Sequence, residues 1–174
     1  MKAKINQHNR KVLRKNNEES TTNARTCNCP NNKICPMDGG CLEKDILYLA
    51  HITSDLRNYK TKEYKGICST TWKERYGNHK KTFNHEKYMK DTTLSIEVWD
   101  IRRKNGQHSI TWKKDQNYPS YNPQLKKCSL CMNEKLEIAL YKEHNLLNKR
   151  SEVVSKCLHR DKFKLINMTS DAIT

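Results

Sequence analysis

The stretch EYKGICSTTWKERYGNHKKTF (residues 63–83) predicts a strand, a turn and a helix in one continuous run. Residues 63–69 have the aromatic and apolar content of a short β-strand that ends in a turn. Ser69 or Thr70 can cap a helix that runs to about residue 83, because a hydroxyl can accept a hydrogen bond from the first helical turn. Large side chains fall at i, i+4, i+7 and i+11 on one face of this helix: Trp72, Tyr76, His79 and Phe83.

Arg75 and His79 stand four residues apart beside this stripe, so both point to the same side of the predicted helix. An arginine fork suits a phosphate oxygen, and a nearby histidine can hydrogen-bond a reacting group or carry a proton. The alternative is a surface arginine and a histidine at the edge of the core, which the spacing by itself favours.

Outward from this stretch, the patterns predict further strands and helices. The segment DILYLAHIT (45–53) is rich in strand-forming residues, and the polar residues 54–62 would join it to 63–69 as an antiparallel hairpin. A second helix begins after a cap at Thr92 or Thr93. The remaining predicted elements are a strand at 108–114, a helix at 128–142 and a short helix at 148–157. The order β-β-α-α-β-α has too few strands for a Rossmann-type sheet.

Composition restricts the class of partner. Only 34% of the 174 residues are hydrophobic and 30% are charged, so we expect a modest core. Lys and Arg number 34 against 19 Asp and Glu, a net charge of +15, which predicts a polyanion as partner, nucleic acid first. A basic binding domain without catalysis is the alternative. Because no segment resembles a membrane span or a signal peptide, we expect a soluble intracellular protein without membrane contact.

Eight cysteines in a chain without a secretion signal favour metal ligation over disulfides. One set follows the spacing C-x-C-x5-C-x5-C, which can close a tetrahedral zinc site: Cys27, Cys29, Cys35 and Cys41. A second set can form a Cys₃His site: Cys128, Cys131, Cys157 and His159. His79 or His85 could instead complete a mixed site of two Cys and two His. Reduced structural cysteines or disulfides are the alternatives to metal, and Cys68, alone in a strand, is predicted to be a core residue.

Three further residues stand out by position. Glu134 follows Cys131 by three residues and lies in the apolar stripe of the 128–142 helix, where an unpaired carboxylate is unfavourable. One carboxylate with phosphate as co-ligand is enough to hold Mg²⁺, whereas the alternative is a residue at the helix edge that reaches solvent. Tyr48 and Tyr64, one in each strand of the hairpin, can position water near an arginine, although tyrosine is also common in strands.

In this order, the residues resemble a GIY-YIG endonuclease. ILY (46–48) and YKG (64–66) stand where that family has its two tripeptides. The matching positions are Tyr48, Tyr64, Gly66, Arg75 and His79 on the helix, Glu134 as metal ligand, and Asn148 in NLLNKR. The blocks TCNCPNNKICPMDGGCL, RYGNHKKTFNHEKY, CSLCMNEKLEI and LLNKRSEVVSKCLHRDKF are similar to the endonuclease domain of Penelope-like retroelements and related eukaryotic element fragments. Together they cover roughly residues 8–164.

The resemblance implies an α/β (α+β) fold, with a small three-stranded antiparallel sheet flanked by helices and a zinc-binding segment before the first strand. It also implies hydrolysis of a DNA phosphodiester with one divalent ion, Mg²⁺ or Mn²⁺, held by Glu134. Tyr48 with His79 would activate water. The remaining roles fall to Arg75 and Tyr64, which would steady the scissile phosphate, and to Asn148, which would orient the site.

The implied organisation is a flexible basic arm (1–26), a Cys-rich zinc knuckle (27–45), a GIY-YIG-like nuclease domain (46–165) and a tail (166–174). Since the chain has no room for a polymerase, it would be the nuclease part of a longer retroelement protein, with a reverse transcriptase domain as partner, or a degenerate copy. The need to reach chromosomal DNA implies a nuclear location. The alternative function is a zinc-stabilised nucleic-acid-binding module without catalysis.

The sequence departs from the family pattern in the two tripeptides. ILY replaces the leading glycine and isoleucine of the first, and the gap between the two motifs is long. Lys65 replaces the apolar centre of the second. This replacement is tolerable if the Lys65 side chain faces solvent or phosphate, because a charged group would otherwise be buried in the sheet.

Overall fold

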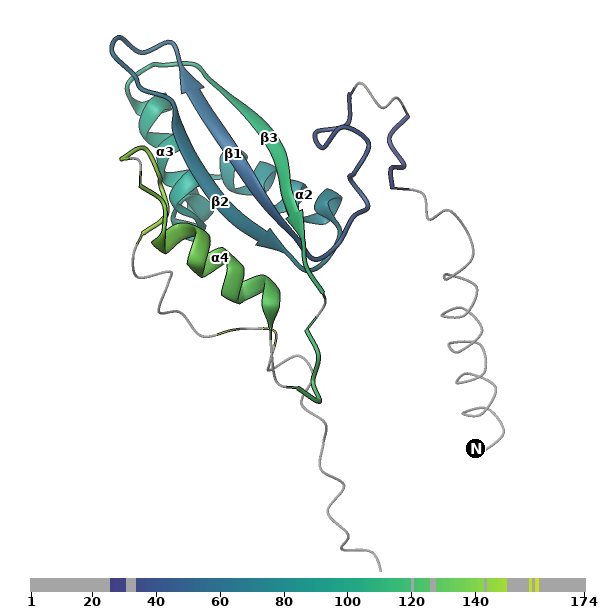
Figure 1. Cartoon of the computed structure of the whole chain (residues 1–174). Coiled ribbons are helices and arrows are strands. Elements are labelled where there is room, and N and C mark those ends of the chain that lie inside the picture. Colours follow the sequence, from purple (N-terminus) through teal and green to yellow (C-terminus); the bar gives the residue numbers. More distant parts are fainter. Residues whose placement is uncertain are drawn as a thin grey trace, which may run out of the picture.

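The computed structural model describes residues 26–30, 34–119, 121–125, 128–142, 144–149, 157 and 159. It is a mixed α/β fold with one antiparallel sheet and helices, as predicted (Figure 1). None of the described helices is long and apolar enough to cross a membrane. The elements follow the order β1 (Ile46–Ser54), β2 (Lys62–Cys68), α2 (Trp72–Asn84), the 3-10 helix η2 (Glu86–Asp91), α3 (Thr93–Arg103), β3 (His108–Asn117) and α4 (Ser129–Ala139).

The sheet has the order β2-β1-β3, so β1 pairs with a neighbour on each side. Both pairings are antiparallel, with Tyr48 opposite Gly66 on β2 and Ala50 opposite Trp112 on β3. A register shift against β3 falls between Leu47 and Tyr48. Since β1 is covered on both faces, most of its side chains are buried: Ile46, Leu47, Tyr48, Ala50 and Ile52.

Helices α2 and α4 cover opposite faces of the sheet. Tyr64 and Lys65 are consecutive on β2, so their side chains point to opposite faces. The Tyr64 ring lies 6.0 Å from the ring of His79 on α2, whereas Lys65 Nζ pairs with the carboxylate of Glu137 on α4. Figure 1 shows α4 in front of the sheet and α2 behind it. The condition that Lys65 faces solvent or phosphate is therefore not met: the side chain is buried, and the Glu137 carboxylate compensates its charge.

Local hydrogen bonds set the helix starts. The α2 cap is Thr71, whose hydroxyl accepts from Glu74 N, and neither Ser69 nor Thr70 has this role. The sequence offered three hydroxyl residues in a row, and only the residue directly before the first helical position can cap. The cap of α3 at Thr92 is as predicted, with a reciprocal capping box to Ser95.

The other boundaries differ by a few residues from those predicted. β3 continues to Asn117, which pairs with Ile46. α4 ends at Ala139, because the chain turns back: the Tyr141 hydroxyl donates to Glu63 Oε2 at 2.6 Å, and Leu147 N donates to Glu63 O. Residues 148, 149 and 157 are not helical. Residues 150–156 of the predicted 148–157 helix, the 1–26 arm up to residue 25 and the 166–174 tail lie outside the described residues.

Two glycines allow a matched test of this packing. A Cβ on Gly66 would lie 2.5 Å from Tyr48 Oη and 2.6 Å from Cζ, whereas a Cβ on Gly77, in α2, would meet nothing within 4 Å. We expect Gly66→Ala to destabilise the protein by about 1–3 kcal/mol, because the buried Tyr48 ring must shift. Gly77→Ala should stabilise it by about 0.5–1 kcal/mol through helix propensity. Urea unfolding measures both, and equal stability of Gly66→Ala and wild type would contradict the close approach.

Candidate functional site

The phenol of Tyr48 links two polar side chains of α2. Arg75 Nε donates a hydrogen bond to Tyr48 Oη at 2.9 Å, and His79 Nε2 lies 2.7 Å from the same oxygen. Arginine can only donate, so the hydrogen-bond pattern assigns the Tyr48 proton to the bond with His79 Nε2 and the imidazole proton to Nδ1. Tyr48 and His79 are both buried, so these bonds satisfy polar groups that water does not reach.

The electrostatics keep this group uncharged apart from Arg75. Burial raises the pKa of Tyr48 well above its usual value, and the nearby Tyr64 adds to the shift, while Arg75 opposes it. Burial, and then the Arg75 charge, lower the pKa of His79 to about 3. At neutral pH a protonated phenol therefore donates to a neutral imidazole.

Arg75 also faces a cavity. Its Nη1 and Nη2 atoms make no hydrogen bond or ion pair with the residues that the structure describes. The cavity, of about 220 Å³, is lined by Arg75, Asn78, His79, Lys81, Thr82, Asp91 and Thr92. The guanidinium is thus held by Nε and presents its two outer nitrogens, a geometry that suits a bidentate contact with a phosphate.

β2 completes the surroundings of Tyr48. The Tyr64 ring lies 6.4 Å from the Tyr48 ring, and the absent side chain of Gly66 makes room for the Tyr48 hydroxyl. Asn148 holds the backbone between them: Lys65 N donates to Asn148 Oδ1 at 2.7 Å, and Asn148 Nδ2 donates to Lys65 O at 2.8 Å. These two hydrogen bonds from the Asn148 side-chain amide hold the β2 backbone at Lys65 much as the backbone of a neighbouring strand would.

Glu134 has a different position. It lies half-buried on α4, in the stripe that contains the buried Leu130, Cys131 and Ile138. α4 covers the sheet face opposite α2. The structure therefore joins Tyr48, Tyr64, Arg75 and His79 in one contact group, brings Asn148 to its backbone, and places Glu134 on the helix across the sheet.

Trp112 is a member of this group that the sequence analysis missed. Its ring lies 5.1 Å from His79 and from Trp72, and 5.9 Å from Tyr48. The available signal was alternation in β3, where Ile110 and Trp112 are more buried than their exposed neighbours. Only the pairing of Trp112 with Ala50 shows that this face meets Tyr48.

The first cysteine cluster forms as predicted. The four thiols of Cys27, Cys29, Cys35 and Cys41 lie within 4.8 Å of one another. Cys41 Sγ is 3.5 Å from Cys27 Sγ and 3.7 Å from Cys29 Sγ. Tetrahedral zinc with bonds of about 2.3 Å requires sulfur atoms roughly 3.8 Å apart, so the cluster is compatible with structural zinc. All eight cysteines are free thiols in this structure.

The second cluster joins the start of α4 to the C-terminal segment. Its ligand atoms, from Cys128, Cys131, Cys157 and His159, also lie within 4.8 Å of one another. His159 Nδ1 is 3.1 Å from Cys131 Sγ and 3.3 Å from Cys128 Sγ. This Cys₃His set is likewise compatible with structural zinc. His79 contacts Tyr48 instead, so it completes no mixed Cys-His site among the described residues.

Without a bound cation, the thiols of both clusters resist deprotonation. Burial and the neighbouring thiols raise the pKa of Cys29 to about 12 and raise that of Cys131 in the same way. A bound cation would reverse this preference, because zinc takes thiolates and releases their protons. Cys68 belongs to neither cluster: it is buried, and its thiol donates to Thr70 O at 3.1 Å.

Comparison with protein-family models, with curated proteins and with solved structures finds no match to this chain. The parts of the candidate site are a buried phenol, a neutral imidazole and an arginine open to a cavity.

Zinc content tests both clusters at once. Protein purified with reductant and without chelator should contain about two zinc ions per chain, one for each cluster. Cys41→Ser and Cys131→Ser should each lose one, because each removes a ligand from a different cluster, and Cys68→Ala should keep both. Elemental analysis measures the ratio, and near-zero zinc in the wild type would contradict both sites.

The buried imidazole makes a prediction about pH. The folded state resists protonation of His79 down to a pKa of about 3, while an unfolded chain takes up that proton near 6.5. The unfolded state binds more protons in this window, so stability is present above pH 6.5 and falls as pH falls, by about 1.4 kcal/mol per pH unit for one such group. His79→Asn should show a flatter decline between pH 7 and 5 in urea unfolding.

The matched control is His85→Asn, since His85 is exposed at the end of α2. Its stability should fall with pH as steeply as that of the wild type. Equal slopes for His79→Asn and the wild type would contradict the neutral buried state of His79.

Proposed function

We propose that this protein is a metal-dependent endonuclease of the GIY-YIG type that hydrolyses phosphodiester bonds in DNA, within a retroelement protein that acts in the nucleus. The observation that carries the proposal is the hydrogen-bonded group of Tyr48, Arg75 and His79, in which Arg75 presents its outer nitrogens to a cavity. The net charge of +15 supports a polyanionic substrate.

Phosphodiester hydrolysis needs stabilisation of negative charge on the phosphoryl oxygens as water attacks phosphorus and the P–O bond to the leaving group breaks. Arg75 suits this role, because its bond to Tyr48 fixes the guanidinium before the substrate arrives. Lys81 and Asn78 line the same cavity and add a charge and an amide near the phosphate.

The Tyr48–His79 bond supplies a path for the proton of the attacking water. The phenol can pass its proton to His79 Nε2 and take one from water at the same oxygen. The Arg75 charge is one cause of the low pKa of His79. A phosphate bound to Arg75 would offset that charge, so the imidazole would become a better base when substrate is present.

A divalent ion would be held by Glu134, together with phosphate oxygens and water. One carboxylate is enough to bind Mg²⁺ or Mn²⁺ when phosphate oxygens and water supply the other ligands. The half-buried carboxylate of Glu134 on α4 is an oxygen donor of this type. When bound, the ion would polarise a phosphoryl oxygen and lower the pKa of water. Because α4 and α2 cover opposite faces, this role requires Glu134 to reach the phosphate past the edge strand β2.

A second function is favoured by one specific observation. Tyr48 is fully buried, so water does not contact its oxygen in this arrangement. A zinc-stabilised nucleic-acid-binding module has no such requirement, because binding needs only a basic surface and a stable frame. In that case the Tyr48 group would be a polar part of the core.

Plasmid nicking distinguishes the two. With Mg²⁺ or Mn²⁺, wild type should convert supercoiled DNA to the open circle, and Arg75→Ala, Tyr48→Phe and Glu134→Gln should each be slower by about 10²–10³-fold. Arg57→Ala, at an exposed loop residue, is the control and should act as wild type. Equal background nicking by wild type and all variants, with DNA binding retained, would contradict the endonuclease and support the binding module.

A further inference from the structure

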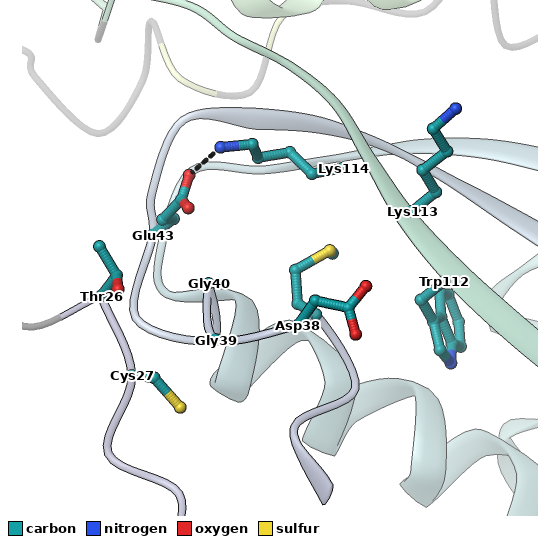
Figure 2. A pocket seen from close by; sticks show the side chains of 10 residues that line it. Thr26, Cys27, Asp38, Gly39, Gly40, Glu43, Trp112, Lys113 and Lys114 are labelled. Atoms are coloured by element: carbon teal, nitrogen blue, oxygen red, sulfur yellow. Dashed lines mark hydrogen bonds and ion pairs between the residues drawn. The ribbon is translucent and has the colours of Figure 1, made fainter. Parts of the chain in front are cut away.

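A larger cavity lies beside the Tyr48 group, between the Cys27–Cys41 segment and β3. It has a volume of about 610 Å³, in the range of small-molecule pockets, and is open to solvent. The residues that matter for recognition are Asp38, Glu43, Trp112 and Lys114, with Gly39 and Gly40 forming the turn opposite β3 (Figure 2). The cavity therefore combines an aromatic wall with a polar loop.

Trp112 provides the aromatic wall. β3 is an edge strand, and the Trp112 side chain is half-buried at that edge. Its ring is fixed by edge contacts with two aromatic rings of α2, 5.1 Å from Trp72 and 5.9 Å from Tyr76. Because these contacts already hold the indole in place, stacking on a planar ligand would cost Trp112 little further conformational entropy.

The polar groups of the cavity differ in availability. Glu43 is engaged, since it accepts from Lys114 Nζ at 2.8 Å and from Asn117. Asp38 is exposed in the turn, with a φ of 44°, and its carboxylate makes no hydrogen bond or ion pair within the described part of the chain. Figure 2 shows this carboxylate turned toward Trp112. A carboxylate accepts only, so it suits the N–H donors on the edge of a nucleobase.

Positive charge lies along the β3 side of the cavity, where Lys113 and Lys114 are among the lining residues. Lys113 leaves β3 in the direction opposite to Trp112 (Figure 2), and it is exposed. Lys80 Nζ lies over the ring of Tyr76, 5.8 Å from its centroid. Lysines placed in this way can contact the phosphates of a strand whose base enters the cavity.

From these observations we propose that the cavity binds an unpaired nucleobase, stacked on Trp112 and hydrogen-bonded to Asp38. The inference rests on the proposed function and names its substrate class: a nucleic acid with an unpaired base beside the cut. Because the Trp112 ring lies 5.1 Å from that of His79, the base would lie close to a phosphate held at Arg75. A base inside a duplex is stacked on both faces and cannot take this position.

The experiment measures binding without catalysis, by fluorescence anisotropy of labelled oligonucleotides with the full zinc-loaded chain and no added Mg²⁺ or Mn²⁺. Wild type should prefer a single strand to a duplex of the same sequence. Trp112→Ala should weaken single-strand binding by about 5–150-fold, the range expected for one stacked base, and Trp112→Phe should retain most of it. The matched control is Trp99→Ala, because Trp99 lies on α3 and its indole donates to Thr82 O.

An abasic oligonucleotide separates stacking from a general loss of structure. A strand whose central nucleotides lack bases keeps its phosphates, so it should bind wild type as weakly as the intact strand binds Trp112→Ala. Equal wild-type affinity for intact and abasic strands, or no preference over duplex, would overturn the inference. Base-dependent binding without nicking would support the base-binding cavity and contradict the endonuclease. Nicking without base-dependent binding would support the endonuclease and contradict the base-binding cavity.

Discussion

A phenol hydroxyl at the centre of the sheet must find its hydrogen-bond partners inside the protein, because an unsatisfied buried donor or acceptor costs about 1–3 kcal/mol. For Tyr48 the partners are Arg75 and His79, and only a helix presents residues four apart to one atom in this way. β2 must then approach without a side chain at Gly66. The position of α2, the composition of β2 and the orientation of Arg75 all follow from this one group.

The two cysteine clusters help to hold helices α2 and α4 in place at their first residues. A chain that is only 34% hydrophobic has few residues with which to hold two helices on a three-stranded sheet. The first cluster meets the start of α2, where Trp72 N and Lys73 N donate to Glu43 O and Cys41 O. The second meets the start of α4 through Cys128 and Cys131. Helices α2 and α4 thus each begin at a group of thiols.

The sequence patterns predicted the structural features that depend on residues close together in the chain. Periodicity placed the strands and the α2 face, and the spacing of Arg75 and His79 predicted that both lie on one side of the helix. The two cysteine sets were also correct, because their ligand types leave few combinations. The pairing of Lys65 with Glu137 could not be predicted, since it depends on which sheet face α4 covers. Trp112 was missed for a similar reason, because its role needs the register between β1 and β3.

The hydrogen bonds from the first residues of α2 to the cysteine segment also bear on where this domain begins. Leu42 N donates to Thr26 O, and the carbonyl groups of Cys41 and Glu43 serve as acceptors for the helix. The segment at 27–45 is therefore integral to the sheet-and-helix unit, and a boundary at residue 46 would remove acceptors from the helix that holds Arg75. A transfer of this domain to another protein would therefore have to move the thiols together with the sheet.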